Sequence, residues 1–227
     1  MDSSMAPPWR LGDTVKGVVA VVLGGAGLLA LAVSLERGGL TSGTAASLLA
    51  GGMLEALLLL AAWTFSVRRY RCSFETLGFR SVKGYHFWLI PLIAVVASLL
   101  AGGIYTLIVN GLGVDVLVPP DLSDSFENPH GLSRLGLAFV VVVMAPIAEE
   151  TFFRGFLVQG LTPWAGPVGA AVGSSVLFSL SHGYIGALIP VFFSGLILAW
   201  VFMKTRSLTP GIFAHSIQNS LAFSLTF

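Results

Sequence analysis

Long apolar runs separated by short polar stretches are the main pattern along this chain. A membrane-spanning helix needs about 20 consecutive, predominantly apolar residues. Windows of roughly that length lie at 14–35, 45–67, 86–110, 135–158, 165–182, 186–203 and 209–227. The pattern therefore predicts an all-α fold: a single transmembrane bundle of about seven helices (six to eight) over residues 14–227, preceded by a short segment, 1–13.

The first window could also be a signal peptide, because Ala30-Leu31-Ala32 resembles a cleavage site. The apolar core of a signal peptide is usually about 7–15 residues long. The apolar run here is longer, so we expect an uncleaved first helix.

The distribution of lysine and arginine predicts how the bundle is oriented, because cytoplasmic loops are rich in both. Basic residues lie before and at the start of the first window (Arg10, Lys16), follow the second (68–83) and precede the last (Lys204, Arg206). The loop at 111–133 is instead acidic. With seven spans, the basic stretches share one side of the membrane and the acidic loop lies on the other. We therefore expect a cytoplasmic N-terminus. The acidic residues of that loop are Asp115, Asp121, Asp124 and Glu127.

Composition supports the membrane assignment. The chain is 55% hydrophobic and only 10% charged, whereas soluble domains carry about 25% charged residues. Most of the outer surface must therefore face lipid, so we expect an integral membrane protein. As its location we expect the plasma (inner) membrane of a prokaryote, a prediction that composition does not address. A net charge of +1 gives no reason to expect nucleic acid as a partner, and the single cysteine, Cys72, excludes an intramolecular disulfide. The 27 glycines indicate close helix packing and not phosphate binding.

The fourth window holds two acids and a base within six residues: Glu149, Glu150 and Arg154. A charge at membrane depth costs on the order of 2.5–3.5 kcal/mol, so each needs a reason to be there. Glu150 and Arg154 are four residues apart with the acid first, the favourable order for an ion pair on one helix face. Glu149 lies about 100° around the helix. It is left without a local partner, as a general base requires.

Two later windows supply further polar groups. His182 lies at the end of the fifth, and His215 and Asn219 lie four apart on one face of the seventh. Together with Glu149 they predict one convergent polar site within the bundle. Other ionisable residues have simpler interpretations. His86 and His130 are expected to be interfacial or hydrogen-bonded in packing, and Glu55 is expected to pair with a polar group of the bundle or to touch the site.

These residues resemble the signature of a known family. The stretches Glu149-Glu150-x-x-x-Arg154, Phe178-x-x-x-His182 and His215-x-x-x-Asn219 are similar to the three motifs of the CAAX prenyl protease and bacteriocin-processing (CPBP, or Abi) intramembrane proteases. The motifs stand in the same order on consecutive windows. The similarity covers roughly residues 135–222, which would form the catalytic core. Upstream of it only a weak match at Leu77-Gly78-Phe79 is seen.

The resemblance implies an endopeptidase that works within the membrane. By that resemblance, Glu149 activates water, His182 positions the water, and His215 with Asn219 stabilises the oxyanion. Glu150, Arg154 and Phe178 would support the site. Amide hydrolysis needs a base within reach of water and donors aimed at the developing oxyanion, so these residue types suit the chemistry.

Metal use is open from the sequence. Glu149, His182 and His215 could form a zinc site with an open water position. The chain lacks the His-Glu-x-x-His pattern, in which the base is separate from the ligands. If Glu149 were a ligand, Glu150 could be the base, but Arg154 would then lose its partner. We favour a mechanism that requires no metal or other cofactor.

A single site also makes a demand on the fold. Straight, full-length helices would place His182 near the outer end of the fifth span, far from Glu149. The segment from Gly160 to Gly169 must therefore delay the fifth helix, or that helix must be steeply tilted. Pro163 and Pro167 favour a bend there.

Two other functions compete with proteolysis. Buried acids and histidines also form proton relays, so a proton- or ion-coupled transporter is an alternative, although no inverted repeat is evident. A non-catalytic scaffold or bacteriocin-immunity protein of the same fold is the other. The resemblance suggests a peptide or lipidated protein substrate, reached from the cytoplasmic side of the bilayer. The sequence specifies neither the substrate nor the oligomeric state.

Overall fold

Apolar segments of this length form helices because a helix pairs its own backbone groups where no water can. The computed structural model describes residues 7–41, 43–119 and 131–226, without the side chains of Thr44 and His86. Within these ranges the chain is helical and contains no strand, and the predicted all-α membrane bundle of about seven helices is confirmed. His130, Asp121, Asp124 and Glu127 lie outside the described residues, so their predicted roles stay predictions.

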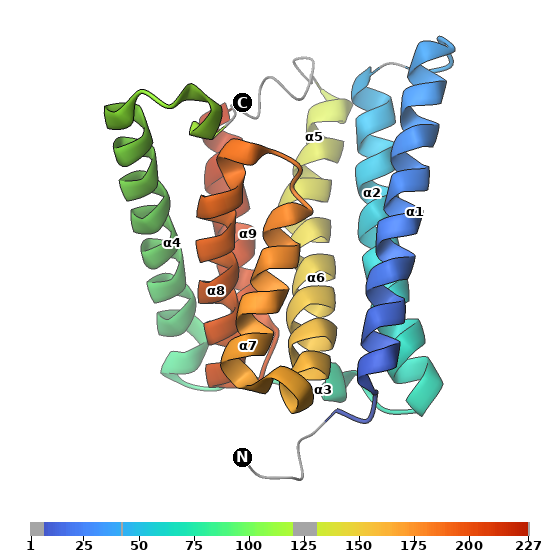
Figure 1. Cartoon of the computed structure of the whole chain (residues 1–227), viewed down its shortest axis with the longest axis vertical. Coiled ribbons are helices and arrows are strands. Elements are labelled where there is room, and N and C mark those ends of the chain that lie inside the picture. The colour runs from blue at the N-terminus through green and yellow to red at the C-terminus, as the bar shows by residue number, and fades with distance from the viewer. Residues whose placement is uncertain (1–6, 42, 120–130, 227) are drawn as a thin grey trace.

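Seven helical passes run side by side along the long axis of the bundle (Figure 1). Most passes are single helices, and the fourth is a composite of α-helical and π-helical turns. α1 and α2 pair at one edge of Figure 1, α4 lies at the other, and α6 to α9 stand between them. The passes are α1 (Leu11–Arg37), α2 (Gly43–Trp63) with η2 (Thr64–Arg68), α4 (Tyr85–Leu112), the composite of α5 (Leu132–Phe139), η5 (Val140–Met144), α6 (Ala145–Glu149) and η6 (Glu150–Val158), then α7 (Gln159–Leu180), α8 (Leu188–Thr205) and α9 (Thr209–Thr226).

Among the described residues, five helical stretches are long and apolar enough to cross a membrane. One of them, Leu132–Leu180, holds two passes, because the chain turns back at Gly166. α9 falls below the same apolar level because it carries His215, Gln218 and Asn219. The seventh pass is therefore recognised by its place in the bundle and less by its composition. The five stretches are Leu11–Arg37, Ala45–Arg68, Phe87–Leu112, Leu132–Leu180 and Ile185–Thr205.

The expected break before the fifth pass is present at Gly166. Its φ of 70° and ψ of 171° are a conformation that glycine adopts without strain, and Pro167 follows it. Only 14 helical residues remain from Pro167 to Leu180. At 1.5 Å per residue they span about 21 Å, less than the roughly 30 Å of a bilayer core. α7 therefore stops part-way up the bundle (Figure 1), which keeps His182 at depth.

A short segment at the N-terminal end of the bundle holds the composite fourth pass in place. It consists of α3 (Phe74–Leu77) and the residues after it. The Gly78 carbonyl accepts from Leu208 N at 2.8 Å, and the Thr76 carbonyl accepts from Gln159 Nε2 at 3.0 Å. Gly155 is required below this segment, because a Cβ there would lie 2.7 Å from the Leu77 carbonyl oxygen. The segment thus joins η6 to the start of α9.

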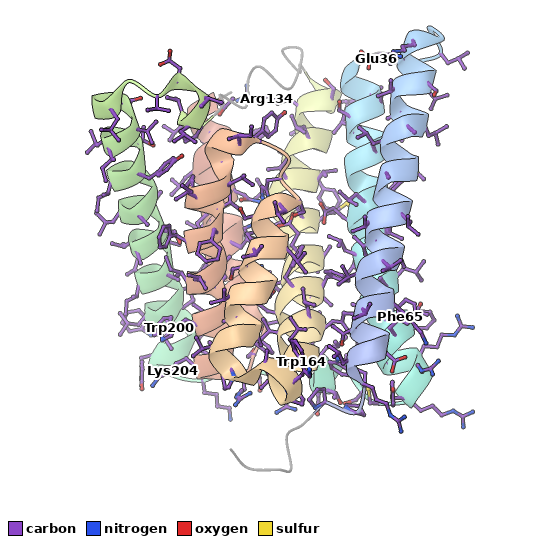
Figure 2. The ribbon with its side chains drawn as sticks, viewed as in Figure 1. Glu36, Phe65, Arg134, Trp164, Trp200 and Lys204 are labelled. Atoms are coloured by element: carbon purple, nitrogen blue, oxygen red, sulfur yellow. The ribbon has the colours of Figure 1, made fainter. Side chains whose placement is uncertain are left out.

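The two ends of the bundle differ in their side chains. Lys204, Trp164 and Trp200 lie at the end where α1 begins, and Glu36 and Arg134 lie at the opposite end (Figure 2). α1 begins at one end and α9 finishes at the other, as an odd number of passes requires (Figure 1). This arrangement is compatible with a cytoplasmic N-terminus, which stays a prediction.

Candidate active site

The predicted ion pair of the first motif is present and fully enclosed. Arg154 Nη1 lies 2.8 Å from Glu150 Oε1, and the two side chains are 1% and 0% exposed. Arg154 Nη2 also donates to the Gly195 carbonyl at 3.2 Å, and its guanidinium lies 4.3 Å from the centre of the Phe178 ring. Both charged residues belong to η6, whose nine residues are all buried. A π-helical turn is rare and frequently marks a functional site.

His215 joins the two glutamates. Its Nδ1 lies 3.3 Å from Glu150 Oε1, and its Nε2 lies 3.5 Å from Glu149 Oε2. Gly211, one turn earlier on α9, permits this approach, because a Cβ there would lie 2.9 Å from Glu150 Oε2. The order of contacts is therefore Arg154, Glu150, His215, Glu149. Glu149 therefore finds its partner, His215, on α9 and not on its own helix.

The two glutamates differ in their access to solvent. The side chain of Glu149 is 15% exposed, and that of Glu150 is 0% exposed. A general base must reach the water that it deprotonates. Glu149 meets this condition, whereas Glu150 is enclosed and bound to Arg154.

Phe178 is the aromatic centre of the site. Its ring centroid lies 4.9 Å from that of His182 and 5.8 Å from that of His215, in edge-to-face geometry, and it also covers Arg154. His182 Nδ1 lies 2.8 Å from the Phe178 carbonyl oxygen. A carbonyl only accepts, so Nδ1 carries the hydrogen and Nε2 of the neutral ring is left as an acceptor.

Asn219 lies beside these groups, and one of its two amide N–H donors is already hydrogen-bonded. Its Nδ2 donates to the Val141 carbonyl of η5 at 2.8 Å, which fixes the amide and leaves its second N–H. His182, His215, Asn219 and Phe178 line one cavity of about 240 Å³ between α4, α7, α8 and α9. A larger cavity of about 660 Å³, at the start of α1, contains no motif residue and is not the candidate site.

The structure therefore brings the three motifs together. His182 and His215 share a cavity and pack on one phenyl ring, and His215 reaches Glu149. A single site requires His182 to lie deep in the bundle. The bend at Gly166 shortens the fifth pass and so satisfies this requirement.

Three polar residues of the cavity were not predicted. Gln218 accepts from Ser194 Oγ at 2.9 Å and donates to Ser98 Oγ at 3.2 Å. Gln218 adjoins Asn219, so its position in the third motif could have suggested it. Ser98 and Ser194 lie in apolar windows that carry no local signal.

A zinc site does not fit the side chains as they stand. Among the described residues, no group of three or more histidine, cysteine, aspartate and glutamate side chains could hold one metal ion. His215 meets Glu149, but its other nitrogen faces Glu150, and His182 Nδ1 is taken by a backbone carbonyl. We derive no step through a metal.

Comparison with known families identifies the segment that carries these residues. Residues 131–221 match the family described as type II CAAX prenyl endopeptidase Rce1-like. This segment is Rce1-like. It runs from the start of α5 into α9, so it contains all three motifs, and the suspected protease family is confirmed. No curated protein and no solved structure matches the chain.

The Rce1-like segment covers about two fifths of the chain, and α1 to α4 lie outside it. Together, the apolar helices and this CAAX-protease-like segment indicate an integral membrane protein. Chemically, its site offers two imidazoles and an amide that line a cavity, and one accessible carboxylate, Glu149, in contact with the imidazole of His215. A base and hydrogen-bond donors of these kinds suit amide hydrolysis.

Proposed function

We propose that this protein is an intramembrane endopeptidase that hydrolyses a peptide bond of a membrane-associated substrate with water activated by Glu149. The observation that carries the proposal is the unequal environment of the glutamate pair. Glu150 is enclosed and paired with Arg154, while Glu149 is accessible and contacts His215. One acid thus supports the site and the other is available as a base.

The catalytic steps follow from the hydrogen-bonding roles. Glu149 takes a proton from water while His182 Nε2 accepts a hydrogen bond from the same water. The water oxygen attacks the substrate carbonyl, and the second N–H of Asn219 donates to the oxyanion. Glu149 then passes its proton to the leaving amine, the C–N bond breaks, and the carboxylate is restored.

His215 has a more specific part. Glu150, which is paired with Arg154, accepts from Nδ1–H of His215. Nε2 can therefore donate only when the ring carries both protons. In that state two cations, Arg154 and His215, balance two carboxylates. When Glu149 becomes neutral by taking the proton of water, the Nε2–H of His215 is free to donate a hydrogen bond to the oxyanion instead.

The substrate class rests on the family and on the setting. An Rce1-like segment favours a lipidated, CAAX-type protein C-terminus. α6, which ends at Glu149, lies about half-way along the bundle (Figure 1), so the scissile bond must enter the membrane. We propose that it enters from the cytoplasmic leaflet of a prokaryotic plasma membrane, on the side with the basic loops.

The test is cleavage by the purified protein in lipid nanodiscs. The probes are an internally quenched farnesylated CAAX peptide and its unprenylated analogue. Glu149→Gln should lower kcat by about 10²–10⁴-fold, the usual contribution of a general base, with unchanged thermal unfolding. Glu36→Gln, an exposed acid at the far end of the bundle (Figure 2), is the matched control and should cleave normally.

The outcomes separate the candidate functions. Wild-type activity in Glu149→Gln would exclude the proposed base. Failure of the wild type to cleave either peptide would favour a non-catalytic scaffold. Addition of 1,10-phenanthroline should leave the rate unchanged, because we propose that no metal takes part. A chelator-sensitive rate that zinc restores would contradict this.

A further inference from the structure

Glu55 is a buried acid that the mechanism above does not use. It lies on α2, outside the Rce1-like segment, and is only 6% exposed. Its Oε2 is buried without a hydrogen-bond partner, and the described part of the chain provides no cation in an ion pair with it. A charge at this depth is costly, so the carboxyl group needs a reason to be there.

The packing of α2 places Glu55 beside the catalytic pass. Gly51 faces Val140, and Leu58 and Ala62 share a core cluster with Ala148 and Phe152. Glu55 lies one turn before Leu58 on the same face of α2, so it occupies the seam between these two contacts. The two passes run in the same direction, which keeps this register along the seam (Figure 1).

Glu149 lies next to the seam that Glu55 occupies. It ends α6, which packs on α2, and it directly follows Ala148, which shares a core cluster with Leu58. Glu55 lies one turn before Leu58, so the two glutamates are about one helical turn apart along the seam, a separation that two such long side chains can bridge. The other charged groups of the site, Glu150 and Arg154, are paired with each other.

The depth of Glu55 favours its neutral form. Ionised Glu55 would place a second carboxylate beside Glu149 in the middle of the membrane, whereas the carboxylic acid adds no charge and offers an O–H donor.

We propose that Glu55 is a positioning residue for the reaction: a neutral carboxylic acid that donates a hydrogen bond to Glu149 and holds the base toward water. The proposal deepens the proposed function and rests on it for the role of Glu149. It gives α2 a direct part in the site, although the family match begins only at α5.

The first experiment needs no substrate. Infrared difference spectra of the protein in nanodiscs, wild type against Glu55→Gln at neutral pH, should show the C=O stretch of a protonated carboxyl that disappears in the variant and shifts in D₂O. Glu36→Gln is the control and should show only carboxylate bands. Carboxylate bands alone in the Glu55→Gln difference would overturn the proposal, whatever the protein cleaves.

The second experiment measures cleavage of the farnesylated peptide. Glu55→Leu should fold at least as well as the wild type, because it removes a buried polar group. Its kcat should fall by about 10–100-fold with little change in KM, since a slightly misplaced base costs that much. Glu55→Gln keeps a neutral N–H donor and should retain kcat within about threefold, because the donor and not the charge positions Glu149.

The pH profile separates positioning from packing. In the wild type, ionisation of Glu55 at alkaline pH should lower activity, since it places a second charge beside Glu149. Glu55→Gln should lose that alkaline decline. Wild-type kcat in Glu55→Leu, or equal losses in Glu55→Leu and Glu55→Gln, would overturn the proposal. Activity in Glu149→Gln would instead overturn the proposed function, so the two failures are distinguishable.

Discussion

α1 and η6 are both apolar helical segments, but the protein uses them in opposite ways. Of the 27 residues of α1, only Asp13, Thr14 and Gly17 are buried, whereas all nine residues of η6 are buried. Lipid is as apolar as a leucine side chain, so α1 can face it without loss. η6 carries Glu150 and Arg154, which lipid could not accommodate. The surrounding passes therefore provide the polar partners and the packing that η6 needs. Substitutions in the two segments should differ greatly in effect.

The largest expected effect is on Arg154. Arg154→Met leaves Glu150 enclosed and without its cation, which should lower the free energy of unfolding by about 3–5 kcal/mol. Thermal or denaturant unfolding in nanodiscs measures it. Arg37→Met, at the exposed end of α1, should change stability by less than about 0.5 kcal/mol. Equal stabilities for the two variants would mean that the buried pair is not structural.

Asn219 should show a large effect on catalysis and a small one on folding. Asn219→Ala removes the donor proposed for the oxyanion, so kcat for the farnesylated peptide should fall by about 10²–10³-fold. Ser220→Ala is the matched control, because Ser220 Oγ only donates to the Ser216 carbonyl of its own helix. If kcat of Asn219→Ala falls only to the extent that its unfolding temperature falls, Asn219 has a structural role alone.

An intermediate effect is expected at Gly211, and Gly27 is the matched glycine of α1. Gly211→Ala places a methyl group 2.9 Å from Glu150 Oε2 and should cost about 1–3 kcal/mol through overpacking, with reduced activity as α9 moves away. Gly27→Ala in α1 meets no atom within 4 Å and should be neutral or stabilising by up to about 1 kcal/mol. Unfolding curves of both variants make the comparison, and the reverse order would contradict the packing of α9 on η6.

The smallest effect should come from the lipid face of α1. Leu23 is 68% exposed, and in Leu23→Ala lipid fills the space that the side chain leaves. The free energy of unfolding should stay within about 0.5 kcal/mol of the wild-type value, and kcat should be unchanged. A larger loss of stability would indicate that a second molecule covers this face.

The sequence predicted those parts of the fold and the site that depend on local spacing. The number of passes follows from apolar runs, and the Glu150–Arg154 pair follows from a four-residue separation on one helix. The turn of the chain at Gly166 was also expected, because two prolines stand within four residues of that glycine.

The remaining features depend on contacts between passes. Nothing near Glu55 in the sequence points to Glu149, since their approach is set by how α2 packs on α6. The π-helical turns η5 and η6 reflect packing and have no sequence signature of their own. The central place of Phe178, between Arg154 and two histidines, likewise comes from three helices meeting.

The early end of α7 has a consequence for the supply of the reactant. Beyond Leu180 the backbone of residues 181–184 is no longer helical, and Ser181, Gly183 and Tyr184 are exposed. Irregular backbone at membrane depth is stable only where protein or water covers it. The turn that follows the shortened α7 therefore needs protein or water around it at membrane depth. In the proposed hydrolysis, the same shortened helix would supply both the histidine of the site and a route for the water that each turnover consumes.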